Sequence, residues 1–296
     1  MDTNEPGIPL AELTAIIPNY KTPELIRICL RLLKKNSDLS KLKVLVIDND
    51  SADDSLDYLR SLDWITLIER KNCEHENGPL MHCRALDMAL EQVDTPFVMV
   101  MHTDTFMISD KWQEFLMGEF TSHQVAGVGS WKLENPPGFF KRLGQKLEDI
   151  LRLVRTGKEK PRPLFLRSHC AVYRTELLKK HTNGFEDFGT AGEAAHKHLV
   201  DAGFEMKFLE SAVLGKYMRH INHATQILNP VAGSNSRTAK AAARSGWQKS
   251  SEFRDTATFC LTTVSTVPER ANENSYCHFQ ILCSVKRNTK RCSAAG

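Results

Sequence analysis

The chain has 296 residues, of which 41% are hydrophobic and 25% are charged, as in an ordinary soluble globular protein. It contains no run of 18 apolar residues, and its N-terminal segment MDTNEPGIPL lacks the apolar core of a signal peptide, so we expect a cytoplasmic protein. The net charge of +3 is unevenly divided, because residues 231–296 balance at +6 and the remainder at −3. The slightly acidic body gives no support to nucleic-acid binding.

Apolar strands alternate with helices along the first half of the chain. Residues 13–20, LTAIIPNY, predict a strand that stops at Pro18, since proline cannot donate to a strand ladder. Thr22-Pro23 then predicts the start of a helix over residues 25–35. Further strands are expected at 43–50, 64–70, 97–101 and 125–131, and further helices at 51–62 (capped by Ser51), 79–92 and 112–120. This alternation predicts an α/β fold with a mainly parallel, Rossmann-like sheet flanked by helices.

The second half of the chain is less regular. Residues 139–158 predict an amphipathic helix with Lys and Arg on its polar face. Its apolar face packs on the domain, or the helix makes peripheral contact with the inner face of a membrane or with a lipid-linked acceptor. A strand and a helix are expected at 167–180, a helix from Glu193 and a last strand at 208–213. We therefore predict one domain over 1–230 and a basic tail over 231–296 that is disordered or loosely attached.

Polar clusters follow three of the predicted strands: Pro18-Asn19-Tyr20, Asp48-Asn49-Asp50-Ser51 and His102-Thr103-Asp104. In parallel α/β sheets, ligands bind at the carboxyl ends of the strands. Each cluster alone also fits a turn or a helix cap. The sequence has neither GxGxxG after its first strand nor GxxxxGK[ST], which argues against a dinucleotide site and a P-loop.

Taken together, these segments resemble the family 2 glycosyltransferases, which have the GT-A fold. The resemblance rests on IIPNYKTPELIRICLRLL, VLVIDNDSADDS and PFVMVMHTDTFM, followed by GEAAHKHLVDAGFEM, and it spans about residues 11–226. It implies an inverting transfer of a sugar from a nucleotide-diphosphate donor to a hydroxyl group. The acceptor would be a saccharide or a lipid-linked molecule, as in the synthesis of a cell-surface polysaccharide or a glycolipid.

The same resemblance implies a divalent cation, Mn²⁺ or Mg²⁺, that neutralises the leaving diphosphate. Asp104 matches the second carboxylate of the DxD motif of the family and is the expected metal ligand, while a turn aspartate is the alternative. His102 replaces the first carboxylate, so the resemblance implies that His102 contacts the nucleotide, as does Thr103. The alternative is that His102 is simply a buried, hydrogen-bonded histidine. His220 or His223 lies where a late histidine of the family completes the metal site.

The resemblance also places the donor nucleotide. Pro18 and Tyr20, with Asn19 between them, should frame the base. Asp48 or Asn49 should hydrogen-bond the base, with Ser51 as a weaker contact because serine also caps helices. Arg84 would meet the diphosphate or form a surface salt bridge.

The expected catalytic base is Glu193, with Asp187 in reserve, because the family places a carboxylate at the start of the late helix. Glu193 could instead only complement the helix dipole. The family pattern has Asp after this Glu, whereas this chain has Ala194. This difference and His102 keep open a non-catalytic protein that binds a nucleotide sugar. A nucleotidyltransferase is a further alternative, although NYKTPE is not the basic, glycine-rich loop that it needs.

Overall fold

The structure is a computed structural model that describes residues 12–73, 75–131, 164–186 and 190–221. Several predicted features lie outside these residues: the helix at 139–158 with its membrane contact, Asp187, His223 and the tail from residue 231. They remain predictions. None of the helices in the described part of the chain combines the length and the apolar run that a membrane crossing requires.

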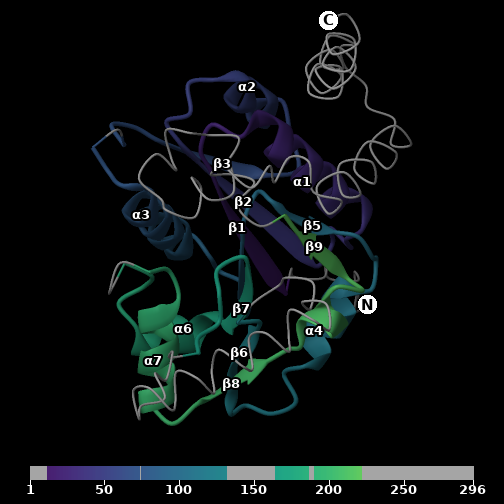
Figure 1. Ribbon diagram of the computed structural model, residues 1–296, viewed down its shortest axis with the longest axis vertical. Coiled ribbons are helices and arrows are strands. Elements are labelled where there is room, and N and C mark those ends of the chain that lie inside the picture. The colour runs from purple at the N-terminus through teal and green to yellow at the C-terminus, as the bar shows by residue number, and fades with distance from the viewer. Residues whose placement is uncertain (1–11, 74, 132–163, 187–189, 222–296) are drawn as a thin grey trace, which may run out of the picture.

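A seven-stranded sheet forms the centre of the molecule, in the order β3-β2-β1-β4-β7-β6-β8 (Figure 1). Its strands are β1 (Leu13–Asn19), β2 (Leu42–Asn49), β3 (Thr66–Arg70), β4 (Phe97–Met101), β6 (Val125–Gly129), β7 (Cys170–Arg174) and β8 (Glu205–Phe208). β7 runs antiparallel to both of its neighbours, and the other described pairs of this sheet are parallel. The predicted mainly parallel α/β sheet is therefore confirmed.

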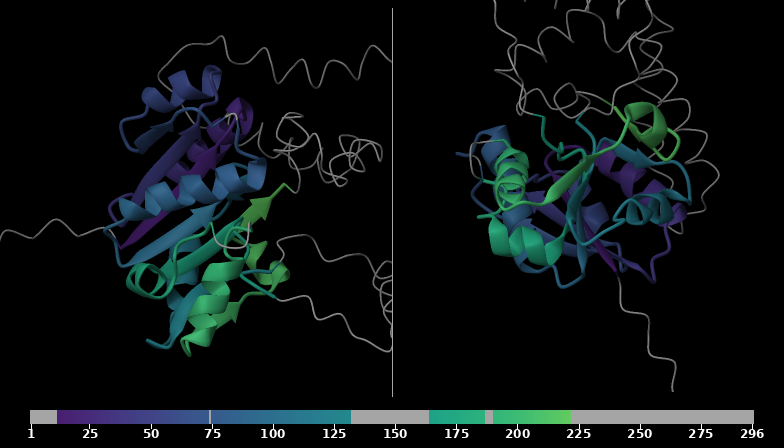
Figure 2. Two further views of the ribbon diagram at one scale, coloured as in Figure 1. Left: turned by 90° about the vertical axis from the view of Figure 1, so that its left-hand side faces the viewer. Right: turned by 90° about the horizontal axis from the view of Figure 1, so that it is seen from below.

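Helices cover both faces of the sheet, as the two views of Figure 2 show. One face carries α1 (Pro23–Lys35), α2 (Asp54–Arg60) and α4 (Trp112–Gly118), and the other carries α3 (Gly78–Glu91), α6 (Thr175–His181) and α7 (Glu193–Asp201). Alternate residues of β2 enter opposite cores, with Val44 and Val46 in one and Leu45 and Ile47 in the other. A strand buried on both faces needs a continuous apolar run, which explains VLVI.

A second, two-stranded sheet pairs β5 (Thr105–Met107) with β9 (Met218–His220) in antiparallel register. Thr105 lies opposite His220, and the Ile221 N–H donates to the Asp104 carbonyl at 2.9 Å. β5 packs on α1, where the Cys29 thiol donates to the Thr105 carbonyl at 3.4 Å. The pairing brings a histidine from late in the chain next to Asp104.

Three local predictions were wrong. The strand expected at 208–213 is β8, which ends at Phe208, and Ser211–Leu214 form the short helix α8. Gly203, with a φ of 89°, turns the chain out of α7, so β8 starts earlier than predicted. β8 ends where its partner strand β6 ends, and there the Leu209 N–H donates to the Gly129 carbonyl. Asp53, not Ser51, caps α2. β1 continues through Pro18 because β4 pairs with it only as far as Ile16.

Candidate active site

The carboxyl ends of β1 and β4 meet at the point where the strand order reverses. From β1 the chain adds β2 and β3 on one side, and β4 returns to the other side of β1. Such a switch point leaves a crevice outside the carboxyl ends of the two neighbouring strands. Asn19 ends β1 and His102 follows β4, so two of the predicted clusters lie at this point.

The first two clusters are joined by a buried hydrogen-bond network. The Asn19 amide donates to Asp48 Oδ1 and to Ser55 Oγ, each at 2.9 Å. The Ser51 hydroxyl donates to Asp48 Oδ1 at 2.6 Å, and its N–H donates to Asp48 Oδ2 at 2.9 Å. All four side chains are buried. Their polar groups hold the loops after β1 and β2 together, and a direct contact of Asn19, Asp48 or Ser51 with a nucleotide remains a prediction.

His102, Asp104 and His220 form a compact cluster beyond β4. His220 Nε2 lies 3.3 Å from Asp104 Oδ1, and His102 Nδ1 lies 3.7 Å from the same oxygen. One ligand atom from each of the three residues lies within 4.8 Å of the others. The Asp104 side chain is 4% exposed and His220 10%, whereas His102 is 34% exposed and forms the open side of the cluster.

Two further histidines surround this cluster. The ring of His169 stacks on His220, with centroids 4.8 Å apart, and its Nε2 is 2.9 Å from Ser130 Oγ. The ring of His82, on α3, meets His102 edge-on at 4.9 Å. The sequence interpretation missed both, because they lie on segments without a motif. Their contacts fix the orientation of the rings in the cluster.

Burial keeps the imidazoles of His102, His82 and His169 neutral. Desolvation lowers the pKa of His102 to about 4, although Asp104 opposes this effect. It likewise lowers the pKa of His82 to about 3 and that of His169 well below 6.5. Burial alone would raise the pKa of the Asp104 carboxyl, but His220 and then His102 outweigh it and lower the pKa to about 2. At neutral pH the cluster therefore offers the Asp104 carboxylate and an imidazole lone pair of His102, the forms that bind metals.

The comparison with known proteins decides the family. The family model described as Glycosyl transferase family 2 matches residues 14–182, more than half of the chain. The chain belongs to glycosyltransferase family 2. No curated protein matches it by sequence. The match covers the three strand-end clusters of the sequence interpretation and confirms the resemblance on which it rested.

This family 2 chain is similar to solved structures of glycosyltransferases, and the first of the two described here shares its fold. The mannosyltransferase PcManGT from Pyrobaculum calidifontis, in complex with GDP-Man and Mn²⁺, is 16% identical with a TM-score of 0.51, and the alignment covers 96% of this chain and 89% of that one. TarS from S. aureus is 18% identical with a TM-score of 0.49, covering 84% of this chain and 77% of TarS. The GT-A fold expected from the sequence is confirmed.

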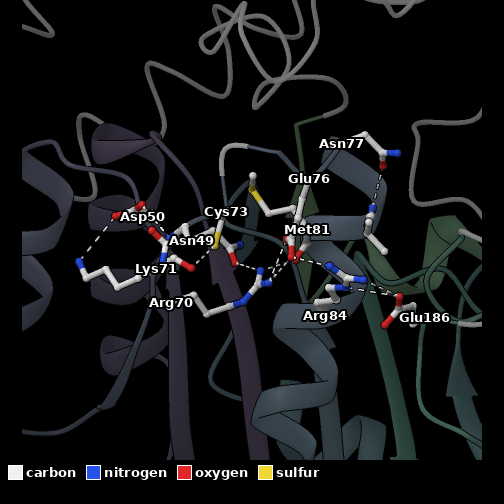
Figure 3. Close-up of polar contacts among 12 residues, drawn as sticks. Asn49, Asp50, Arg70, Lys71, Cys73, Glu76, Asn77, Met81, Arg84 and Glu186 are labelled. Carbon is white, nitrogen blue, oxygen red and sulfur yellow. Dashed lines mark hydrogen bonds and ion pairs between the residues drawn. The ribbon is translucent and has the colours of Figure 1, made fainter.

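In this family 2 protein, Arg84 lies in a series of linked ion pairs (Figure 3). Its guanidinium is 3.0 Å from Glu76 and 3.3 Å from Glu186. Glu76 also receives two hydrogen bonds from Arg70, whose other amino group donates to Asn49 Oδ1 at 2.6 Å. The salt-bridge alternative for Arg84 is thus present, and a contact with the diphosphate remains a prediction.

Arg167 is a second arginine near the site, and the sequence interpretation missed it. Its guanidinium lies over the rings of Trp131, at 5.8 Å, and Phe165, at 5.2 Å. Its positive charge contributes to the low pKa values of His102 and His169. Within the described residues no carboxylate forms a salt bridge with it. The next residue, Ser168, places its hydroxyl 2.9 Å from His102 Nε2.

Glu193 begins α7 beside the segment that carries Arg167. Gly192 precedes it with a φ of 90°, and a side chain at Gly192 would meet the Leu166 carbonyl at 2.8 Å. Glycine therefore lets the start of α7 approach the segment at 164–169. The described residues include no hydrogen bond or ion pair between Glu193 and the three clustered residues. Its role as base remains a prediction.

The other predicted nucleotide residues lie around the crevice. Thr103 is buried, and Thr22 Oγ1 donates to its hydroxyl at 3.4 Å. Tyr20 is half-buried at the end of β1, beside the ammonium group of Lys21. A hollow of about 650 Å³ lies at the opposite edge of the sheet, between Pro96 and Arg174, and it has none of the clustered groups. The clustered groups therefore lie at the carboxyl edge of the sheet, away from this hollow.

Proposed function

We propose that this protein is an inverting glycosyltransferase. It moves a sugar from a nucleotide-diphosphate donor to a hydroxyl group of a saccharide or a lipid-linked acceptor, in the synthesis of a polysaccharide or glycolipid. The observation that carries the proposal is the His102–Asp104–His220 cluster at the carboxyl edge of the sheet of a family 2 chain. PcManGT was solved in complex with GDP-Man and Mn²⁺, which supports a nucleotide sugar and a metal here.

The donor nucleotide would lie across the ends of β1 and β2. Pro18 and Tyr20 frame the base, and the Asn19–Asp48–Ser51 network holds both loops in place. Asn49 Oδ1 already accepts from Arg70, so the amide N–H groups of Asn49 are the first that it can offer to a base. This arrangement suits a carbonyl oxygen on the base.

The diphosphate would lie at the metal cluster. Asp104 and His220 would hold Mn²⁺ or Mg²⁺, and their carboxylate and imidazole donors fit such an ion. A divalent ion there neutralises charge on the leaving diphosphate as a Lewis acid. Arg167 would contact the diphosphate, because it is the arginine beside the cluster whose charge no described carboxylate neutralises. Arg84 is the weaker candidate, since Glu76 and Glu186 already pair with it.

In the transfer itself, the acceptor oxygen attacks the anomeric carbon as the bond to the nucleoside diphosphate breaks. The acceptor proton passes to a carboxylate, for which Glu193 is the first candidate and Asp187 the second. A single displacement of this kind inverts the anomeric centre. A non-catalytic binder of nucleotide sugars is the second candidate function, favoured by Ala194 and His102 where the family pattern has Asp.

Calorimetric titration tests the donor site. UDP, GDP and dTDP are titrated into the full chain with Mn²⁺ or with EDTA, for the wild type, Asp104→Ala and the exposed control Asp110→Ala. We expect one nucleotide to bind with Mn²⁺, with the binding lost in EDTA and in Asp104→Ala and kept in Asp110→Ala. If none binds under either condition, the proposal fails. Release of free sugar from the matching nucleotide sugar separates the enzyme from the binder.

A further inference from the structure

We propose that His102 is a third ligand of the metal site, together with Asp104 and His220, and that this site selects Mn²⁺ and other first-row transition ions over Mg²⁺. The inference rests on the proposed function, because it takes the same cluster as the metal site of the donor complex. It differs from the sequence prediction, in which His102 contacts the nucleotide and the choice between Mn²⁺ and Mg²⁺ is open.

The distances suit a shared ion. Adjacent ligands of an octahedral ion, each about 2.1 Å from the metal, lie about 3.0 Å apart. The His220 and His102 nitrogens are 3.3 and 3.7 Å from Asp104 Oδ1, so small side-chain shifts bring all three atoms to one ion. The two histidines reach this point from the end of β4 and from β9, which pairs with β5 directly after Asp104. His220 therefore stands on a paired strand, and the carbonyls of His102 and Asp104 accept from the Thr105 and Ile221 N–H groups, which limits the movement of all three ligands.

The hydrogen bond on the far side of His102 allows the required tautomer. A neutral imidazole has one N–H and one lone pair, and the partner of one nitrogen decides which is which. His102 Nε2 is 2.9 Å from Ser168 Oγ, and a serine hydroxyl can rotate to accept a proton donor. With Nε2 as the donor, Nδ1 carries the lone pair on the side of Asp104. His102 then has the form of a metal ligand with an oriented outer partner.

The composition of the ligand set decides the preference among ions. Mg²⁺ is a hard ion that favours oxygen ligands and keeps most of its water. Imidazole nitrogen is an acceptable ligand for Mn²⁺, and it binds Co²⁺ and Zn²⁺ more strongly. Two nitrogens and one carboxylate oxygen therefore disfavour Mg²⁺, whereas a site with two carboxylates would accept it. His169 and His82 are not ligands in this proposal, because they contact the rings of His220 and His102.

The test is metal binding by the full chain without nucleotide. Mn²⁺ is titrated and followed by its electron paramagnetic resonance, with Mg²⁺ as competitor, for the wild type, His102→Ala, His102→Asp and the exposed control His123→Asp. We expect the wild type to bind Mn²⁺ at least tenfold more tightly than Mg²⁺. His102→Ala should lower the affinity for Mn²⁺ at least tenfold. His102→Asp should reduce the ratio between the affinities for Mn²⁺ and for Mg²⁺. Pulsed spectra should show ¹⁴N coupling that decreases in both His102 variants and is kept in His123→Asp.

The inference is overturned if correctly folded His102→Ala, judged by circular dichroism, binds Mn²⁺ like the wild type. Equal affinity of the wild type for Mg²⁺ and Mn²⁺ also overturns it. The proposed function is judged separately by nucleotide binding. A chain that binds nucleotide with Mn²⁺ but binds Mg²⁺ and Mn²⁺ with equal affinity keeps the function and loses the inference. A chain that selects Mn²⁺ through His102 but binds no nucleotide keeps the inference and loses the function.

Discussion

Arg167 and Arg84 differ in what surrounds the guanidinium group. Arg84 is held between Glu76 and Glu186, whereas Arg167 lies over Trp131 and Phe165. A cation already paired with carboxylates must give up those partners before it can bind an anion. A cation held by aromatic rings keeps its N–H groups for an anion. This contrast separates the two arginines as partners for a diphosphate.

We expect Arg167→Ala to weaken the binding of the nucleoside diphosphate at least tenfold, since a hydrogen bond to a charged group contributes about 1.5–3 kcal/mol. Arg84→Ala should change it less than threefold. Titration calorimetry with the diphosphate and with the matching nucleoside checks both, because only the diphosphate should lose affinity. A larger loss in Arg84→Ala than in Arg167→Ala would contradict this assignment and favour the role predicted from the sequence.

Asn19 is a buried polar side chain whose amide group donates to two buried partners, Asp48 and Ser55. Asn19→Ala should lower the free energy of unfolding by about 1–3 kcal/mol, because it leaves Asp48 and Ser55 without its amide in a buried site. Urea denaturation measures the loss. In the double variant Asn19→Ala/Ser55→Ala the two losses should not add, since the residues share a hydrogen bond. Full additivity would show that this bond contributes nothing.

The sequence identified most residues of the candidate site but not what they contact. Asn19, Asp48 and Ser51 stood out as polar groups at strand ends, and a buried network requires the same residue types as a nucleotide site. No local pattern distinguishes the two cases. His102, Asp104 and His220 were selected through the family resemblance, and the structure brings them together. Their contact depends on the β5–β9 pairing, which the sequence did not predict.

At the scale of elements, β7 explains why Arg167 and His169 were missed. A strand at this position was predicted, but its direction was not. Because β7 runs antiparallel to β4, its first residue lies opposite the last residue of β4, as the pair Met101–Cys170 shows. The segment that enters β7 therefore reaches the same edge as the segments that leave the parallel strands. If the antiparallel direction of β7 had been predicted, the segment before this strand would have been a candidate part of the site.

The ion pairs of Figure 3 join β3 to α3 through the segment between them. Arg70 ends β3, Arg84 lies on α3, and Glu76 between them pairs with both. The side chains of Arg70 and Glu76 are 8% and 11% exposed, so their charges are largely removed from water. Burial alone would raise the pKa of Glu76, but the hydrogen bonds and charges of Arg84 and Arg70 outweigh it and hold the pKa below 4.5.

Glu76→Gln should therefore destabilise the protein by about 1.5–3 kcal/mol at pH 7. The stabilisation by a carboxylate of lowered pKa is present above about pH 4.5 and is lost as the pH falls below it. The difference between wild type and variant should thus shrink on acidification. Urea denaturation from pH 7 to pH 4 measures it, with Glu114→Gln as the matched control in an exposed pair. A difference that stays constant with pH would contradict the assignment.

At the scale of the whole molecule, the sheet brings distant parts of the chain together. The strand periods and lengths in the sequence sufficed for the α/β class, because each buried strand and amphipathic helix is a local pattern. The order of the strands, the direction of β7 and the small β5–β9 sheet depend on long-range pairing, which has no local pattern. The metal cluster inherits this dependence, since Asp104 directly precedes β5 and His220 ends β9.

Metal binding should therefore raise the stability of the whole molecule. An ion that requires all three ligands binds the folded chain and not the unfolded one, so that 100-fold excess over the dissociation constant adds about 2.7 kcal/mol. We expect Mn²⁺ to raise the thermal unfolding temperature and EDTA to reverse the rise. Differential scanning calorimetry measures it. In Asp104→Ala the rise should be absent, and an equal rise there would place the ion elsewhere.

The pairing of β5 with β9 also bears on how far the chain must extend to include the candidate metal site. The match to the family ends at residue 182, and the central sheet is complete at Phe208. A chain cut between Phe208 and Met218 would keep all seven strands of that sheet, yet it would lose both the partner of β5 and His220. The histidine beside Asp104 and the strand that carries it thus lie beyond both the family match and the last strand of the central sheet.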